Sequence, residues 1–305
     1  MAPGASYMAD RSKIGWTDAT WNPVTGCSVI SPGCTNCYAM RLAGGRLKNH
    51  PSRAGLTQPS KTGPVWNGKV RFNDAWLEQP MDWSKPRRIF VVAHGDLFHP
   101  NVPDEWIDRT HSIMAHCPQH IFQVLTKRPD RMRDYYRAAS QRIVGDTEIP
   151  FKNVWRGVSA EDEPRAEERL PILIDTLAAV RFVSLEPLLE YVDLSPWLPG
   201  LDWVIIGGES GPHARPFELN WARRIISQCQ AAGVAVFMKQ IGANVWASGG
   251  TDFLMTAYPP RQASHGDDPD EWPDDLRIQQ YPDLETGEPG PNLLAQPQKE
   301  TRLWA

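Results

Sequence analysis

The chain has 305 residues, of which 41% are hydrophobic and 22% charged; these ordinary values indicate a globular protein and exclude wholesale disorder. No apolar run reaches the roughly 18 residues that a membrane span requires, and the first 13 residues lack the apolar core of a secretory signal, so we expect a cytoplasmic protein without membrane contact. The net charge of −4 excludes a protein that coats nucleic acid in bulk.

The charge is spread unevenly along the chain. Residues 1–90 contain 12 lysines and arginines against 5 acidic residues, whereas residues 262–305 contain 3 against 10. A basic front third suits an anionic partner such as a nucleic acid or nucleotide, and a solvated surface explains it equally well. Five tryptophans of this third could stack on bases, although core packing is the simpler interpretation; they are Trp16, Trp21, Trp66, Trp76 and Trp83.

Short apolar runs recur from residue 88 onward and predict strands that are buried on both faces of a parallel sheet. These runs are residues 88–93, 120–125, 153–158, 180–185, 201–206 and 233–238. Stretches with helical spacing lie between most of them, at residues 105–115, 129–140, 164–177 and 220–232. This alternation predicts an α/β fold with right-handed crossovers.

Polar side chains that could bind a ligand or take part in catalysis follow each of the six predicted strands. In a parallel barrel the carboxyl ends of the strands surround one mouth, where ligands bind, whereas an open doubly wound sheet would gather them near one switch point. We therefore predict a parallel (β/α) barrel, partial and TIM-like, with a ring of candidate residues at its mouth. The ring consists of Asp96, Lys127, Arg128, Ser159, Glu161, Glu186, Glu209, Ser210, Lys239 and Gln240.

The remaining segments predict tails and loops around one barrel, which would span residues 14–258. Residues 1–13 are expected to be a disordered N-terminus. The polar segment 44–64 contains Gly, Pro and Ser and is predicted as a long loop inserted over the mouth. Residues 259–305 are predicted to be an acidic, Pro-rich extension, exposed over residues 259–273.

Three of the five cysteines crowd into eleven residues, in the pattern Cys27-x6-Cys34-x2-Cys37. The odd number of cysteines disfavours a disulfide framework. Cys117 and Cys229 stand alone in helix-like stretches, where a cysteine is most simply a small buried apolar residue. The cluster of three is therefore the feature that needs a chemical explanation.

Three explanations of this cysteine loop are open. Three thiolates can hold a [4Fe–4S] cluster and leave one iron open. A zinc site could instead be completed by His50, and Cys34 with Cys37 could form a redox dithiol. The cluster is favoured because it uses all three cysteines, whereas a dithiol does not need Cys27 and zinc sites commonly have two close pairs of ligands.

Seven blocks of the sequence resemble the signature blocks of an uncharacterised family of bacteriophage and bacterial proteins. That family is in turn similar to the radical S-adenosylmethionine superfamily, in which a cluster loop precedes a partial parallel barrel and of which spore photoproduct lyase is a DNA-repairing member. The chain departs from the superfamily's usual C-x3-C-x2-C spacing, with six residues in the first gap and an aromatic residue after the last cysteine, so sequence leaves open whether S-adenosylmethionine is cleaved. The blocks are residues 14–39, 95–100, 125–129, 153–162, 182–189, 203–216 and 237–242.

The resemblance implies S-adenosylmethionine as a cofactor, reductive formation of a 5'-deoxyadenosyl radical, and an electron donor such as flavodoxin or ferredoxin. In this interpretation Asp96 suits the ammonium group of the cofactor, and Lys127 or Arg128 suits its carboxylate. Ser159 and Glu186 suit the ribose hydroxyls. The substrate would be a nucleic acid or a nucleotide, and the choice between a lyase and a transferase stays open.

Five further residues complete the candidate site. Gly207 and Gly208 would allow the backbone to approach a ligand closely. Glu209, Lys239 and Tyr38 are the candidate catalytic residues, because Lys239 could position an anion or donate a proton and Tyr38 directly follows the last cysteine.

Two other classes of function remain as alternatives. A metal-free hydrolase could use Glu186 and Glu209 as paired carboxylates, although the three cysteines would then be unexplained. A zinc-bound module for nucleic acids or proteins would use the cysteines and His50 structurally, and the charges at the strand ends would be incidental.

Overall fold

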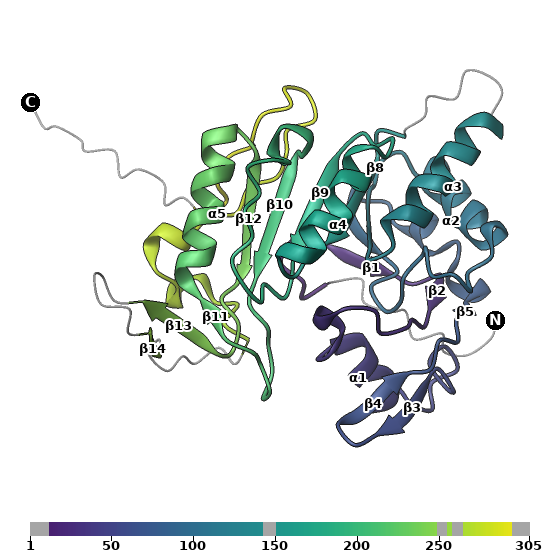
Figure 1. The fold of residues 1–305 in the computed structure, drawn as a ribbon. Coiled ribbons are helices and arrows are strands. Elements are labelled where there is room, and N and C mark those ends of the chain that lie inside the picture. Colours follow the sequence, from purple (N-terminus) through teal and green to yellow (C-terminus); the bar gives the residue numbers. More distant parts are fainter. Residues whose placement is uncertain (1–11, 143–150, 249–254, 258–264, 295–305) are drawn as a thin grey trace, which may run out of the picture.

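The computed structural model describes residues 12–142, 151–248, 255–257 and 265–294 (Figure 1). Its centre is a seven-stranded sheet in which every neighbouring pair is parallel and the strand order follows the chain. The strands are β1 (Ala19–Trp21), β6 (Arg88–Val91), β7 (Ile121–Thr126), β8 (Val154–Ser159), β9 (Arg181–Leu185), β10 (Trp203–Gly207) and β12 (Ala235–Gln240). All six predicted strands are confirmed, while β1 was not predicted because it is too short to give a periodic signal.

The four long helices pack against one face of this sheet and share its larger apolar core. They confirm the four helices predicted from sequence, and local signals explain their ends. The Asp162 carboxylate accepts a hydrogen bond from the Arg165 amide at the start of the third, and Gly233 ends the fourth with a φ of 68°. Their bounds are α2 (Asp104–His116), α3 (Pro129–Arg142), α4 (Glu163–Ile174) and α5 (Leu219–Ala232).

The other face of the sheet carries an aromatic core. The Trp16 ring lies 4.7 Å from Phe90 on β6 and 6.2 Å from Trp203 on β10, measured between centroids, so a single side chain touches strands that are four places apart in the sheet. Such contacts require the sheet to curl around Trp16. The architecture is therefore a half-barrel flanked by helices, which agrees with the α/β prediction.

A C-terminal segment fills the gap between the two edges of the half-barrel. Residues 278–280 run antiparallel to β12, with the Met238 amide donating to the Ile278 carbonyl at 2.8 Å. The Tyr281 hydroxyl reaches the Gly15 carbonyl at 3.5 Å, on the β1 side. The prediction that residues 259–273 are exposed is wrong at its C-terminal end, because Trp272 is 2% exposed; acidic composition hid a segment that packs onto the core.

Residues 38–72 form a small lobe beside the sheet, which we call the basic lobe (Figure 1). Helix α1 (Tyr38–Gly44) packs on a hairpin of β3 (Thr57–Ser60) and β4 (Gly63–Trp66) around Met40, Leu56 and Trp66. A Cβ on Gly44 would collide with Pro64, so glycine permits this close packing. The loop predicted at 44–64 consists of turns over residues 45–56, but its second half forms this hairpin, whose strands Pro, Ser and Lys masked.

The remaining elements are short. The short strands are β2 (Val24–Thr25), β5 (Arg71–Phe72), β11 (Phe217–Glu218), β13 (Val245–Ser248) and β14 (Met255–Ala257). The 3-10 helices are η1 (Pro32–Cys34), η2 (Asp74–Trp76), η3 (Gln79–Asp82), η4 (Leu198–Gly200), η5 (Pro269–Glu271) and η6 (Asp274–Leu276). Residues 1–11, expected to be disordered, lie outside the described residues. In the part of the chain that is described, no helix is long and apolar enough to span a membrane.

Candidate functional site at the barrel mouth

The cysteine loop, residues 27–37, begins at the carboxyl edge of the sheet. Gly26 pairs in parallel with Gly95, which follows β6, and this bridge directs Cys27 toward the ends of the strands. Gly26 has a φ of 100°, and a Cβ there would strike the Lys69 carbonyl. Glycine is therefore required where the loop starts.

Two carboxylates from distant strands fasten the cysteine loop across the mouth. The Gly33 amide donates to Glu161 Oε1 at 2.9 Å, and Glu161 follows β8. The Asn36 Nδ2 donates to Glu209 Oε2 at 2.9 Å, and Glu209 follows β10. The loop is thus tied to two separate points on the rim of the half-barrel.

Glu161 is fully buried within a cluster of positive charges. Its Oε2 lies 3.1 Å from Arg169 Nη1 and 3.6 Å from Lys127 Nζ. Burial raises the pKa of this carboxyl, but Lys127, a hydrogen bond from Ser31, Arg169 and the Gly33 amide together lower it to about 2. Glu161 is therefore a structural anion that holds the loop and α4 together.

Arg215 binds both oxygens of the Glu209 carboxylate, in addition to the hydrogen bond from Asn36. Arg215 donates from Nε to Oε2 at 3.0 Å and from Nη2 to Oε1 at 2.6 Å, and its Nη1 reaches the Pro32 carbonyl of the cysteine loop at 2.9 Å. Burial raises the pKa of Glu209, but hydrogen bonds from Arg215 and Asn36 outweigh it and lower the pKa. A carboxylate with both oxygens bound in this way is a poor general acid, which disfavours the paired-carboxylate hydrolase.

Asp96 positions an arginine next to the first cysteine. The buried Asp96 carboxylate accepts from the Thr126 hydroxyl at 2.7 Å, from the Phe98 amide at 2.9 Å and from Arg128 Nη1 at 2.7 Å. The same Arg128 nitrogen lies 3.7 Å from Cys27 Sγ. The strand-end positions of Asp96 and Arg128 were predicted, and the structure brings both to the cysteine loop.

All three cysteines of the loop are free thiols. Cys34 is buried, and Cys27 and Cys37 pack against the apolar cluster of the basic lobe. Burial raises the pKa of Cys27 to about 12, with Asp96 adding to the effect and Arg128 opposing it, and burial also raises the pKa of Cys37. Among the described residues, no three His, Cys, Asp or Glu side chains meet in a metal-binding arrangement.

His50 is engaged by a serine and a tryptophan. Its Nδ1 lies 2.7 Å from the Ser52 hydroxyl, and its ring lies 5.9 Å from that of Trp76. This placement gives no support to His50 as a fourth zinc ligand.

Glu186 and Lys239 meet inside the mouth, on the inner face of the sheet. Lys239 Nζ lies 2.6 Å from Glu186 Oε1, while the Trp16 indole nitrogen donates to Oε2 at 3.1 Å and the Ser184 hydroxyl at 3.3 Å. A Cβ on Gly207 would lie 2.8 Å from Glu186 Oε1, so this glycine makes room for the carboxylate. The pair joins two candidate residues predicted from separate strands.

The other predicted residues fall around this pair or serve packing. Ser159 is buried on β8 and pairs in register with Ser184 on β9. Tyr38 is 47% exposed as a residue, and its hydroxyl donates to the Ala93 carbonyl at 2.6 Å. A Cβ on Gly208 would collide with the Ile241 carbonyl, so backbone packing already accounts for this glycine.

Three residues of the site were not assigned to it from sequence. Arg169 and Arg215 neutralise Glu161 and Glu209, and Trp16 binds Glu186. Arg169 lies on a helix and Arg215 in a loop, and neither position carries a sequence signal for its partner. Trp16 was noted only among the tryptophans expected to pack in the core, which the structure confirms for Trp16, Trp21, Trp66 and Trp83.

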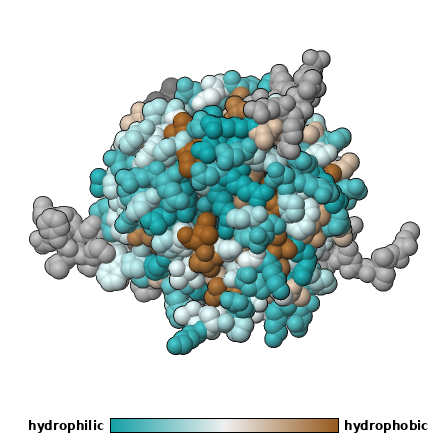
Figure 2. Space-filling view, turned by 45° about the vertical axis from the view of Figure 1, so that its right-hand side comes forward, coloured by the Kyte–Doolittle hydropathy of each residue, from teal (hydrophilic) through white to brown (hydrophobic). Residues whose placement is uncertain are grey.

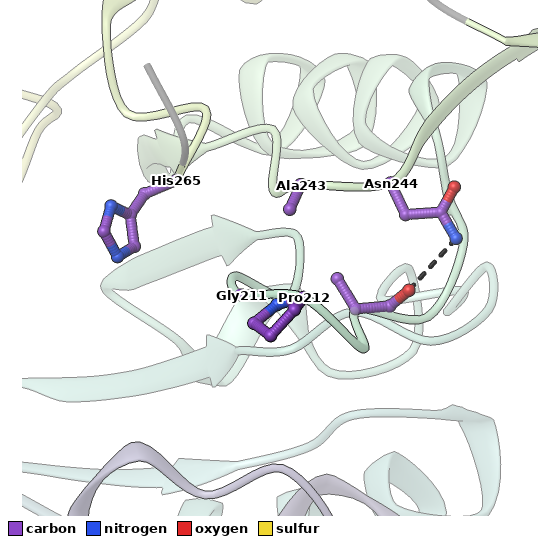
Figure 3. Close-up of a pocket in the computed structure, with 6 residues that line it drawn as sticks. Gly211, Pro212, Ala243, Asn244 and His265 are labelled. Atoms are coloured by element: carbon purple, nitrogen blue, oxygen red, sulfur yellow. Dashed lines mark hydrogen bonds between the residues drawn. The ribbon is translucent and has the colours of Figure 1, made fainter. Parts of the chain in front are cut away.

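A hollow of about 630 Å³ opens beside the loop that follows β10 (Figure 3). Asn244 Nδ2 donates to the Ala214 carbonyl at 3.0 Å across its edge. The lining offers few polar groups that converge on one point. It consists of Gly211, Pro212, Ala214, Ala243, Asn244 and His265.

Residues 11–275 match the model of a family described as a protein of unknown function, DUF5131. The chain belongs to this family. No curated protein and no solved structure matches the chain. Membership in DUF5131 assigns no activity, so any function must be argued from the mouth itself.

Proposed function

We propose that this DUF5131 protein is a radical S-adenosylmethionine-type iron–sulfur enzyme on a partial TIM-type barrel, acting on a nucleic acid or nucleotide. Cys27, Cys34 and Cys37 would be the ligands of a [4Fe–4S] cluster. One observation carries the proposal: three free thiols lie on a single loop that Glu161 and Glu209 fasten across the carboxyl ends of parallel strands. That edge is where parallel barrels bind their ligands.

The donor set suits a cluster in its chemistry. Iron–sulfur clusters are held by thiolates, and Arg128 places a positive charge 3.7 Å from Cys27 Sγ. Burial raises the pKa of Cys27 and of Cys37, so these thiols need a nearby positive centre to ionise. Binding requires the three side chains to turn toward one point, because they do not meet in this structure.

When bound, such a cluster supplies the electron for reductive cleavage of S-adenosylmethionine. The residues of the chain then have three tasks. Asp96 holds Arg128 against Cys27. Glu186 and Lys239 present a carboxylate and an ammonium group to a polar ligand on the inner face. Tyr38 anchors the end of the cysteine loop through its hydrogen bond to the Ala93 carbonyl.

Iron, sulfide and zinc analysis of the anaerobically purified protein tests the proposal. We expect about four irons and four sulfides per chain, lost in Cys34→Ala and kept in the control Cys117→Ala, which alters a buried cysteine outside the loop. The loaded protein, reduced with dithionite, should then release 5'-deoxyadenosine from S-adenosylmethionine. Stoichiometric zinc with no iron after anaerobic reconstitution would contradict the proposal and favour the zinc module.

A further inference from the structure

A run of 55 residues around the cysteine loop contains no acidic residue. Between Asp18 and Asp74 the sequence has no Asp or Glu, although it has seven lysines and arginines. The run includes the whole cysteine loop and the whole basic lobe. Its basic residues are Arg41, Arg46, Lys48, Arg53, Lys61, Lys69 and Arg71.

Four of the seven basic side chains of the lobe face solvent, whereas Arg53 is buried. Arg46, Lys48, Lys61 and Lys69 are exposed, and within the described ranges none of them lies at ion-pair distance from a carboxylate. By contrast, the exposed Arg137 outside the lobe lies 2.5 Å from Asp175. The positive field of the lobe is therefore left for an external anion.

The basic lobe adjoins the cysteine loop on two sides. Arg41 Nη2 donates to Asn36 Oδ1 at 2.6 Å, between the second and third cysteines. On the other side, the Lys69 carbonyl abuts Gly26, next to Cys27. An anion held on the lobe would thus lie beside the barrel mouth.

We propose that the basic lobe binds the phosphate backbone of a nucleic acid and holds it at the mouth. Phosphate binding needs only cations and hydrogen-bond donors. A protein partner would normally meet an apolar patch, and a membrane surface would meet an apolar helix face. Apart from Tyr38, no described residue of the lobe is a large exposed hydrophobic residue. Val29 and Ile30, which precede the lobe in the sequence and are exposed, belong to the cysteine loop.

The surface of the basic lobe indicates recognition of the phosphate backbone of a nucleic acid rather than of its bases. Trp66 is buried in the lobe core and cannot stack on a base. Among the described residues of the lobe, Tyr38, 47% exposed, is the exposed aromatic residue that could. Figure 2 shows one face of the molecule, mostly hydrophilic with separate apolar patches. Binding should therefore depend strongly on salt and little on sequence.

Fluorescence anisotropy with a labelled 20-nucleotide single strand and the matching duplex tests this inference. The variant Lys48→Gln/Lys61→Gln/Lys69→Gln should bind about tenfold or more weakly, with the slope of log K against log salt reduced by about 2 to 3. The control Lys85→Gln/Arg137→Gln/Arg224→Gln removes the same charge at exposed sites outside the lobe and should bind like the wild type. Equal loss in both variants, or no salt-dependent binding to either probe, overturns the inference and leaves an acidic protein as the partner to seek.

The inference rests on the proposed function for the reaction that would follow binding. The binding of nucleic acid itself does not depend on the cluster. A chain with all three loop cysteines changed to serine cannot hold the cluster, yet it should bind the same probes with unchanged affinity. Binding without iron in the wild type would reject the proposed function alone. A four-iron protein that binds neither probe would reject the basic lobe as a nucleic-acid surface alone.

Discussion

Arg53 in the basic lobe and Arg169 beside the mouth are equally buried, each 1% exposed, but their surroundings differ. Arg169 lies against the Glu161 carboxylate. Arg53 donates only to neutral groups, from Nη2 to His94 Nδ1 at 2.6 Å and from Nη1 to the Ser52 hydroxyl at 2.7 Å. At the mouth the fold supplies a counter-ion to the buried arginine, whereas in the lobe the buried arginine has only neutral partners.

The largest expected effect is that of removing Arg169. Arg169→Met leaves Glu161 buried without its closest cation, and we expect unfolding in urea, followed by tryptophan fluorescence, to report a loss of about 3 to 5 kcal/mol. Arg137→Met, which breaks an exposed pair with Asp175, is the control and should cost less than about 1 kcal/mol. Similar losses in both variants would mean that the mouth is no more tightly fixed than the surface.

Removing Arg53 should cost less, although it is just as buried. Arg53→Met leaves no opposite charge behind, only acceptors on Ser52 and His94, so we expect a loss of about 1 to 3 kcal/mol in the same measurement. Burial lowers the pKa of Arg53 to about 10, which already shows that its charge is unfavourable in the folded state. A loss as large as that of Arg169→Met would reveal an anion near Arg53 and break the comparison.

The partners of the two buried arginines, His94 beside Arg53 and Glu161 beside Arg169, should lose their contributions to stability in different pH windows. Burial, and then Arg53, lower the pKa of His94 from 6.5 to about 3, so His94 stays neutral when folded and its contribution to stability is lost as pH falls from about 6.5 toward 3. Glu161, with a lowered pKa of about 2, loses its contribution only below about pH 4.5. Unfolding free energies measured from pH 7 to pH 5 should therefore fall less in His94→Gln than in the wild type, and Glu161→Gln should not change that slope.

The smallest effect is expected from the exposed lysines of the lobe. Lys48→Gln, Lys61→Gln and Lys69→Gln should each change the free energy of unfolding by less than about 0.5 kcal/mol, because none of these lysines has a described ion pair. Thermal unfolding of the three single variants measures this. A clear destabilisation would assign these lysines to the fold rather than to binding.

The framework of the fold was predictable because buried strands and amphipathic helices leave local patterns. All six later strands, the four long helices and the convergence of Asp96, Glu186 and Lys239 on one edge followed from such patterns. The ion-pair partners could not be predicted in this way. Glu161 lies in a loop and Arg169 on a helix, and no local sequence pattern indicates that they pair. Composition also misled where polar residues form structure, as in the hairpin β3–β4 and in the segment that packs Trp272 into the core.

The contact between Tyr281 and Gly15 joins residues 266 positions apart in the chain. A ribosome makes Gly15 early and Tyr281 only after the last strand of the sheet, so the seam of the half-barrel stays open throughout synthesis. Until then the aromatic interior of the sheet lacks Tyr281, whose ring centroid lies 5.2 Å from that of Trp203 in the complete fold.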